Sequence, residues 1–420
     1  MSSNLSNKTL LVIAPDFFIS ESAASIRMYF FLKANAGQFK KVIYISPNNL
    51  ASSSRMLSGL RSLPKNVNII FVKSKFRLPY PLNKFFDLIL FIKMVAYCIK
   101  TTSLEHIDLI FTSVPPFEIG LASVIISKLR RKNLIVDVRD DWERSKEIGL
   151  KRFFPESLLK LFRFCGLVIY RNAVALTAVS LLLKKYLSRV TKCRHVKLIP
   201  NGADTSLIKP IISPEKLKYI REREHLPKDK ILLIYSGGVA HYHKIDLLFR
   251  AISLLPSNIA NNAHFVFYLN IKDNKRFNKF ENIIQQLKIT NFVEIRKPIN
   301  RERLAEILSA SDIGLISLTT HEYFKYNRPV KLYEYASAGL FVFAIGPKNG
   351  ELELLIRKYR LGEFISTSNP KIIAEKLIQV IENKSSLNQS ARMQRHKIIS
   401  ENYDRLEVMK KMSKIFSRIL

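Results

Sequence analysis

The chain has 420 residues, 47% of them hydrophobic, so it is long enough to bury two full α/β cores. Lysine and arginine outnumber aspartate and glutamate by 68 to 34, and the excess is shared by both halves, which excludes a basic tail on a neutral body. Such a charge attracts phosphorylated substrates, anionic lipid headgroups or nucleic acid. A genome rich in A and T, which favours lysine, is an equally good explanation.

Cysteine content and the first residues indicate the compartment. Cys98, Cys165 and Cys193 form neither a CxxC pair nor an even framework, so we expect reduced thiols, no disulfide and no metal site. The first ten residues lack the charged region and cleavage site of a signal peptide, which favours a cytoplasmic protein. The apolar stretch 85–99 contains two charged residues and is shorter than a bilayer span, so it predicts a core helix.

Strand-like runs follow one another along the chain with helical segments between them. In the first half they lie at 10–14, 41–45, 67–72, 109–112, 134–138, 175–179 and 196–199. The same rhythm restarts at 231–235, 264–269, 292–295, 313–317, 340–345 and 362–365. Alternating strands and crossovers predict parallel sheets covered on both faces. We therefore expect an α/β protein of two Rossmann-like domains that face each other across a cleft.

The turn sequence Pro-Asn-Gly at 200–202 separates the two sets of strands. It predicts an N-terminal domain over 1–202 and a C-terminal domain over 203–420. The lysine-rich tail after residue 370 has a helical pattern, and its last helix is a candidate for packing back on the N-terminal domain. Open α/β sheets bind ligands beyond the carboxyl ends of their strands, so motifs at those ends carry the most functional weight.

The segment PVKLYEYASAG at 329–339 predicts a short helix, with its proline at the first helical position and its glycine at the C-terminal cap. Lys331, Glu334 and Tyr335 then share one face near the helix N-terminus, where free N–H groups favour anions. A diphosphate fits beside Lys331, and Glu334 can accept sugar hydroxyl protons. By itself, the segment fits a capped surface helix with an ion pair equally well.

A second motif supports this site. The strand at 231–235 leads to Gly237 and Gly238, where the absence of Cβ atoms lets a ligand approach the backbone closely. His241 and Lys244 follow as cations near the strand end. A strand, glycine turn and helix in succession is weak evidence alone, because many such turns only reverse the chain.

Three segments of the N-terminal half carry further candidates. The small polar loop at 19–25 is assigned to acceptor or phosphate contact. Asp140 and Asp141 follow the strand 134–138 and could orient an acceptor hydroxyl, unless Arg139 pairs with a neighbouring carboxylate to cap the strand. The segment 151–171 mixes aromatic, aliphatic and basic residues, a pattern typical of a helix in a membrane interface and also of one packed inside a domain.

Taken together, these motifs resemble family 4 retaining glycosyltransferases of the GT-B fold. The resemblance covers nearly the whole chain and rests on motifs whose order and spacing are more specific than any one of them: LLVIAP (10–15), AASIR (23–27), DLIFTSVPP (108–116), VDVRDDW (136–142), AVS (178–180), IPNG (199–202), YSGG (235–238) and PxKLxEY (329–335).

The resemblance implies a nucleotide-binding C-terminal domain and a basic pair that neutralises the diphosphate leaving group without a metal. Lys244 or His241 matches one member of that pair, and Lys331 assists. Glu334 matches the second acid of the family's paired glutamates, which holds the ribose, while the first acid's place is taken by Tyr326. The donor site so implied also contains Gly237, Gly238, Leu332 and Tyr335, with Asp140 on the acceptor side.

The expected function is transfer of a hexosyl unit, with retention, from a UDP- or GDP-sugar to a saccharide or lipid-linked acceptor in surface polysaccharide or lipopolysaccharide assembly. The expected location is cytoplasmic, with peripheral contact to the inner face of an anionic membrane as a hypothesis. The alternatives are a non-catalytic sugar-nucleotide-binding subunit, which Tyr326 motivates, and a non-hydrolysing sugar-nucleotide epimerase. Nucleic-acid binding ranks last, because the basic residues are dispersed and no binding motif is present.

Overall fold

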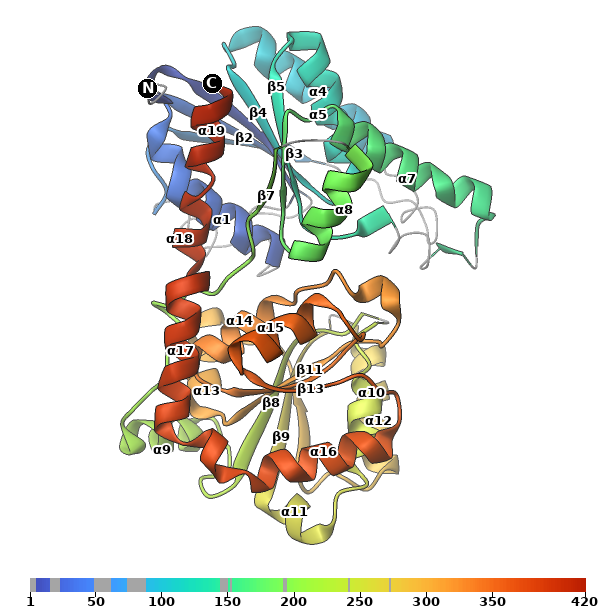
Figure 1. Cartoon of the computed structure of the whole chain (residues 1–420), viewed down its shortest axis with the longest axis vertical. Coiled ribbons are helices and arrows are strands. Elements are labelled where there is room, and N and C mark those ends of the chain that lie inside the picture. Colours follow the sequence, from blue (N-terminus) through green and yellow to red (C-terminus); the bar gives the residue numbers. More distant parts are fainter. Residues whose placement is uncertain are drawn as a thin grey trace. The chain divides into compact units, whose positions relative to one another are not determined.

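The computed structural model describes residues 5–15, 23–48, 62–73, 88–143, 150–151, 153–191, 195–240, 242–271 and 273–420. The chain divides into two units (Figure 1), one of Met1–Asn201 with Arg405–Leu420 and the other of Gly202–Asp404. Most of the predicted loop 19–25 and all of His241 lie outside the described residues.

A parallel sheet of seven strands forms the centre of the first unit, in the order β3-β2-β1-β4-β5-β6-β7. Its strands are β1 (Thr9–Ile13), β2 (Lys41–Asn48), β3 (Val67–Lys73), β4 (Leu109–Val114), β5 (Asn133–Val138), β6 (Ala175–Ala178) and β7 (Val196–Leu198). Its helices are α1 (Ala23–Asn35), α4 (Leu88–Leu104), α5 (Phe117–Arg130), α7 (Glu156–Arg171), α8 (Leu181–Thr191), α18 (Arg405–Lys410) and α19 (Ser413–Ile419).

The second unit is built around a parallel sheet of six strands in the order β10-β9-β8-β11-β12-β13. The strands are β8 (Ile231–Gly238), β9 (Ala263–Asn270), β10 (Val293–Arg296), β11 (Ile313–Ser317), β12 (Phe341–Ile345) and β13 (Gly362–Ile365). The helices are α9 (Pro214–Arg223), α10 (Ile245–Ile252), α11 (Ser257–Asn262), α12 (Asn274–Gln286), α13 (Arg301–Ala310), α14 (Val330–Ser337), α15 (Glu351–Tyr359), α16 (Pro370–Glu382) and α17 (Gln389–Tyr403).

These strands confirm the predicted fold class, with a strand at each of the thirteen predicted positions. The central strands are buried on both faces, as β1 and β4 show over their whole length. A strand covered on both faces needs a continuous apolar run rather than alternation, and that is the pattern the sequence carries. No helix among the described ranges is long and apolar enough to cross a membrane, and the stretch predicted as a core helix contributes to α4.

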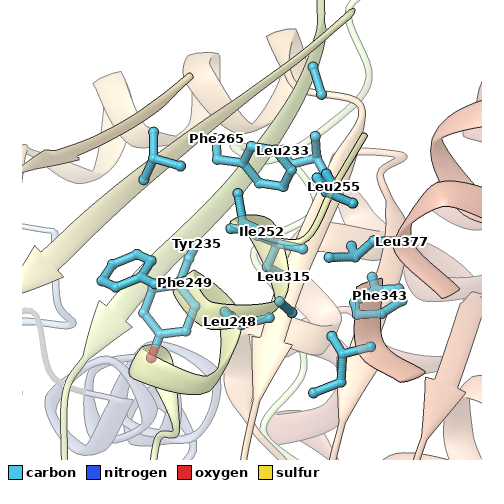
Figure 2. Packing of buried hydrophobic residues seen from close by; sticks show 14 of the residues in the cluster. Leu233, Tyr235, Leu248, Phe249, Ile252, Leu255, Phe265, Leu315, Phe343 and Leu377 are labelled. Atoms are coloured by element: carbon cyan, nitrogen blue, oxygen red, sulfur yellow. The ribbon is translucent and has the colours of Figure 1, made fainter. Parts of the chain in front are cut away.

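Two hydrophobic layers hold the second sheet. Because neighbouring side chains of a strand point to opposite faces, Leu233 and Tyr235 of β8 pack with α10 in one layer, which Figure 2 shows around Phe249. The residues between them, Leu232 and Ile234, pack with α14 in the other layer. The strand sequence thereby fixes α10 and α14 on opposite faces of the sheet.

The C-terminal helices of the chain are divided between the two units. Helix α17 packs on α14, whereas α18 and α19 belong to the first unit. In that unit Phe416 of α19 lies fully buried against Phe31 and Phe39, with ring centroids 6.1 and 5.4 Å away. The last helix, whose packing the sequence left open, therefore completes the core of the first unit.

Candidate functional site

The carboxyl edge of the second sheet brings together the segments that the sequence singled out. Strand order reverses between β8 and β11, which is where open α/β sheets place their ligands. Ser317, at the end of β11, donates through Oγ to the carbonyl of Lys244, 2.9 Å away, and the N–H of Thr319 donates to the carbonyl of Tyr242 at 2.7 Å. The loops after β8 and β11 are therefore tied to each other.

Lys331 is the cation at the centre of this edge. Its Nζ lies 3.7 Å from the centroid of the Tyr235 ring and 3.1 Å from the point where a Cβ on Gly237 would stand. The Nζ atom is buried and has no hydrogen-bond partner within the described parts of the chain. Burial lowers the pKa of Lys331 to about 7, while the nearby carboxylate of Glu334 acts in the opposite direction. A cation held this way lacks a full counter-charge.

Tyr235 builds the turn beneath Lys331, a role that its place in an apolar strand did not reveal. Its ring supports the ammonium, and its hydroxyl donates to the carbonyl of Gly238 at 2.7 Å. Gly237 adopts a φ of +139°, a conformation that side chains rarely tolerate. The glycine turn thus lets the Lys331 ammonium approach the backbone closely.

Tyr335 anchors α14 to the strand end. It is 1% exposed, and its hydroxyl accepts the N–H of Ser236 at 2.8 Å. Its ring occupies the space above Gly314 of β11, where a Cβ would stand 2.5 Å from the Tyr335 Cγ. Burial raises the pKa of Tyr335 above its ordinary value, so the hydroxyl keeps its proton. Tyr335 therefore positions the helix from within the core.

Leu332 is likewise a core residue, with no exposed surface. Its side chain fixes α14 on the sheet and offers no surface to a ligand. The helix also starts later than predicted, because Pro329 is its N-cap and Val330 its first residue. At the other end Gly339 adopts a φ of +83°, the left-handed conformation expected of a C-terminal cap.

Glu334 has a partner that the sequence did not indicate. Arg301, the first residue of α13, places Nη2 3.8 Å from Oε1 of Glu334. Their side chains are 19% and 18% exposed. The Nε and Nη2 atoms of Arg301 are buried and lack hydrogen-bond partners among the residues described. No motif marks Arg301, because it lies 33 positions from Glu334 and at the start of an ordinary surface-patterned helix.

The remaining C-terminal candidates lie at the same edge. Lys244 is the N-cap residue of α10 and has an exposed side chain, and Gly238 is exposed at the end of β8. Tyr326 lies between the short helix η3 (Glu322–Phe324) and α14, with the Nζ of Lys325 5.7 Å from its ring centroid. The second unit thus gathers Gly237, Gly238, Lys244, Lys331 and Glu334 along one sheet edge.

Asp140 belongs to the first unit, where it follows β5 and is exposed. The neighbouring Arg139 donates to the carbonyl of Pro115, a contact that holds the ends of β4 and β5 together. Asp141 is 5% exposed. The first unit therefore presents Asp140 at the carboxyl edge of its own sheet, where open α/β sheets bind ligands.

A buried ion pair below that edge was not anticipated. Arg27 of α1 donates to both carboxylate oxygens of Asp137 at 2.9 and 2.7 Å and to the carbonyls of Ile199 and Pro200. Thr177 and Ser113 donate to the same carboxylate. Burial alone would raise the pKa of Asp137, but Arg27 and these hydrogen bonds hold it below its ordinary value. This network holds α1 against the sheet and against the segment that follows β7.

The described residues contain no group of three or more His, Cys, Asp or Glu side chains placed to hold a metal ion.

Comparison with known proteins bears on this site. Residues 218–400 match the family model of glycosyl transferases group 1. No curated protein matches the sequence.

Solved structures resemble the chain over nearly its whole length. HepE from Anabaena, in complex with UDP and glucose, has a TM-score of 0.72 at 15% identity, covering 98% of this chain and 100% of its own. Sucrose-phosphate synthase from Thermosynechococcus elongatus has a TM-score of 0.74 at 14% identity, covering 98% and 99%. WaaG, a glycosyltransferase involved in lipopolysaccharide biosynthesis, has a TM-score of 0.70 at 14% identity, covering 97% and 99%. The chain thus has the GT-B fold, and its residues 218–400 match the glycosyl transferases group 1 model, which supports a glycosyltransferase enzyme.

Proposed function

We propose that the protein transfers a hexosyl unit from a UDP- or GDP-sugar to a saccharide or lipid-linked acceptor, with retention, during assembly of a surface polysaccharide such as lipopolysaccharide. The observation that carries this proposal is the buried cation Lys331 beside the glycine turn of β8. The group 1 domain contains this whole arrangement, from Tyr235 to Tyr335.

The donor's diphosphate binds beside Lys331 and Gly237. A buried ammonium with no hydrogen-bonded acceptor favours an anionic ligand, and a phosphate oxygen supplies the missing acceptor. The missing Cβ of Gly237 lets the Lys331 ammonium lie against the backbone, so a phosphate that binds this ammonium lies close to the glycine turn. Glu334, on the same helix face and partly exposed, then accepts the hydroxyl protons of the ribose.

Charge on the leaving diphosphate increases as the glycosidic bond breaks, so preorganised cations are most effective there. Lys331 supplies one of them, and Lys244 at the start of α10 supplies the second, with His241 as a further candidate. With cations in these places the reaction requires no metal. For the acceptor hydroxyl, the candidate orienting residue is Asp140, which is exposed after β5.

The donor class agrees with HepE, whose structures hold UDP, UDP with glucose, and UDP-glucose. The acceptor class is supported by WaaG, which acts in lipopolysaccharide biosynthesis. Retention follows from the resemblance of the sequence motifs to family 4 enzymes.

A peripheral position on an anionic membrane completes the proposal. The outer face of α7 exposes Leu161 and Phe164, at 45% and 63%, beside the exposed cations Lys160 and Arg163. Apolar side chains flanked by lysine and arginine are the composition of a helix that lies in a headgroup region. The chain has 68 basic and 34 acidic residues, and this positive charge attracts it to the anionic, cytoplasmic side of a membrane.

The test is to incubate the purified protein with a panel of UDP- and GDP-sugars, with and without lipid-linked saccharide acceptors, and to follow nucleotide release and product stereochemistry. Acceptor-dependent release with a retained anomeric configuration supports the proposal. Donor binding without turnover identifies a non-catalytic binding subunit, and an epimerised sugar nucleotide identifies an epimerase; either result refutes transfer.

Two substitutions test the placement of the site. Glu334→Gln should weaken donor binding, and Lys244→Ala should lower turnover more than binding, because the leaving group needs charge most in the transition state. Lys358→Ala is the matched control, because Lys358 is exposed on α15 and lies over Tyr359 rather than at the site. If Glu334→Gln and Lys244→Ala leave both quantities unchanged, the site lies elsewhere.

A further inference from the structure

Arg301 is a partly buried cation, and part of its hydrogen-bonding capacity is not used. Two of its three guanidinium nitrogens, Nε and Nη2, are shielded from solvent and have no hydrogen-bond partner within the described ranges. Arg27 shows the usual arrangement in this protein, because each of its nitrogens donates to a carboxylate or a carbonyl. A buried donor without an acceptor is rare in folded proteins and calls for a reason.

The position of Arg301 indicates that reason. It begins α13 directly after the loop from β10, at the carboxyl edge where the donor is proposed to bind. Its Nη2 lies 3.8 Å from Oε1 of Glu334, within reach of an ion pair but beyond hydrogen-bond length. The two groups are thus held near each other, and Nε and Nη2 of Arg301, which have no partner among the described residues, can donate to a third group beside Glu334.

The chemistry of the pair defines that group. A carboxylate only accepts hydrogen bonds and a guanidinium only donates them. A hydroxyl does both, so two adjacent hydroxyls can donate to Glu334 while their oxygens accept from Arg301. The planar fork of arginine presents its donors in a fixed geometry that suits two neighbouring oxygens better than a lysine would.

We infer that Arg301 is a further donor-site residue that, together with Glu334, holds the ribose diol of the nucleotide. This inference rests on the proposed function and extends it. Arg301 acts in two ways, by donating to the ribose oxygens and by holding the Glu334 carboxylate in the direction from which it accepts the hydroxyl protons.

The test measures binding of UDP, GDP and the 2′-deoxy form of each by isothermal titration calorimetry. Wild-type protein should bind one ribonucleotide clearly more tightly than its deoxy form. Arg301→Met should weaken the ribonucleotide roughly ten-fold or more, the size expected for a lost hydrogen bond to a charged group, and the deoxy form much less. The ratio of ribonucleotide affinity to 2′-deoxy affinity should therefore fall toward one. In a double-mutant cycle, Arg301→Met and Glu334→Gln together should cost less than the sum of the single effects.

Arg303→Met is the matched control. It lies two residues further along the same helix and pairs with Glu224 through Nε at 2.8 and 2.9 Å, so its loss removes an ion pair without touching the site. In Arg303→Met the ratio of ribonucleotide affinity to 2′-deoxy affinity should stay at the wild-type value. Thermal unfolding followed by circular dichroism checks that each variant folds. If Arg301→Met does not fold, Arg301→Lys takes its place; it keeps the charge but lacks the fork and should also lose most of the ratio.

The outcomes separate this inference from the proposal beneath it. Wild-type protein that binds neither UDP nor GDP refutes the proposed function and the ribose role with it. Wild-type protein that binds, with a folded Arg301 variant that keeps the full preference for the ribonucleotide, refutes the role of Arg301 alone.

Discussion

Replacing Lys331 by methionine should stabilise the protein and at the same time weaken donor binding. The ammonium of Lys331 is buried with no hydrogen-bonded acceptor among the described residues, an arrangement that disfavours the charged form. Binding sites commonly retain such groups at the expense of stability, because the bound ligand supplies the hydrogen-bond acceptor that the folded chain lacks. The substitution therefore separates a functional cation from a structural one.

The magnitude follows from the pKa of Lys331, which burial lowers from 10.5 to about 7. In the unfolded chain the side chain regains its ordinary pKa, so at pH 7 the folded state loses at most about 4 kcal/mol. The contact with the Tyr235 ring offsets about 1–2 kcal/mol of this loss in folding free energy. Methionine keeps a contact with the ring and carries no charge. We expect Lys331→Met to raise the free energy of unfolding by about 1–3 kcal/mol at pH 7.

The sign of the pH dependence is fixed. Between pH 7 and 10.5 the unfolded chain binds more protons at this position than the folded protein, so the stability of the wild type rises with pH over that range. The penalty is fully present below pH 7 and disappears as the pH approaches 10.5. The advantage of Lys331→Met should therefore be largest at pH 6–7 and shrink by pH 9.5.

The assay is thermal unfolding of wild type and variant across that pH range, where 1 kcal/mol corresponds to roughly 2–4 °C for a domain of this size. Lys358→Met is the control, because Lys358 also lies over a tyrosine ring, with Nζ 4.8 Å from the Tyr359 centroid, but is exposed. It should change the melting temperature little at any pH. A Lys331→Met protein that is no more stable at pH 7, or whose advantage does not vary with pH, refutes the reasoning.

Three further predictions concern the donor, the core and the membrane. UDP affinity, measured by calorimetry, should fall as the pH rises from 6.5 to 8.5, because the diphosphate binds the protonated form of Lys331; Lys331→Met should lack that component. Gly314→Ala should destabilise the protein by about 1–3 kcal/mol in urea unfolding, because its Cβ would stand 2.5 Å from Cγ of Tyr335; an unchanged midpoint would show that the ring can move away. Phe164→Ser should reduce co-sedimentation with vesicles of phosphatidylglycerol, whereas Leu129→Ser, at an exposed position of α5, should not; equal binding by both variants would remove α7 from the membrane contact.

The sequence predicts the architecture because buried parallel strands have a local signature. Each needs four to eight apolar, mostly β-branched residues in a row, and crossovers separate them at regular spacing. The runs around β1 and β8 could be located without knowing what packs on them. The same local reasoning places Lys331 and Glu334 on one helix face, since residues three apart in a helix are neighbours.

Local reasoning fails where the role of a residue depends on what packs against it. Leu332 and Tyr335 share the motif with Lys331, yet their side chains are buried in the core. In the sequence Tyr235 is indistinguishable from the other strand residues, but in the structure its ring contacts the Lys331 ammonium and its hydroxyl holds the glycine turn. Which face a helix turns to the sheet is decided by the other elements, so the motif alone could not separate ligand contacts from packing.

By itself, then, the sequence determines the order and type of the elements, the α/β class and the segments that reach the carboxyl edges, because these depend on periodicity and turn chemistry within short windows. The tertiary structure decides which side chains meet there. Arg301 and Glu334 lie 33 residues apart on different helices, and their approach to 3.8 Å comes from how α13 and α14 pack on the sheet. No pattern within either helix carries that information, because the distance between two helices is set by the residues of the sheet beneath them.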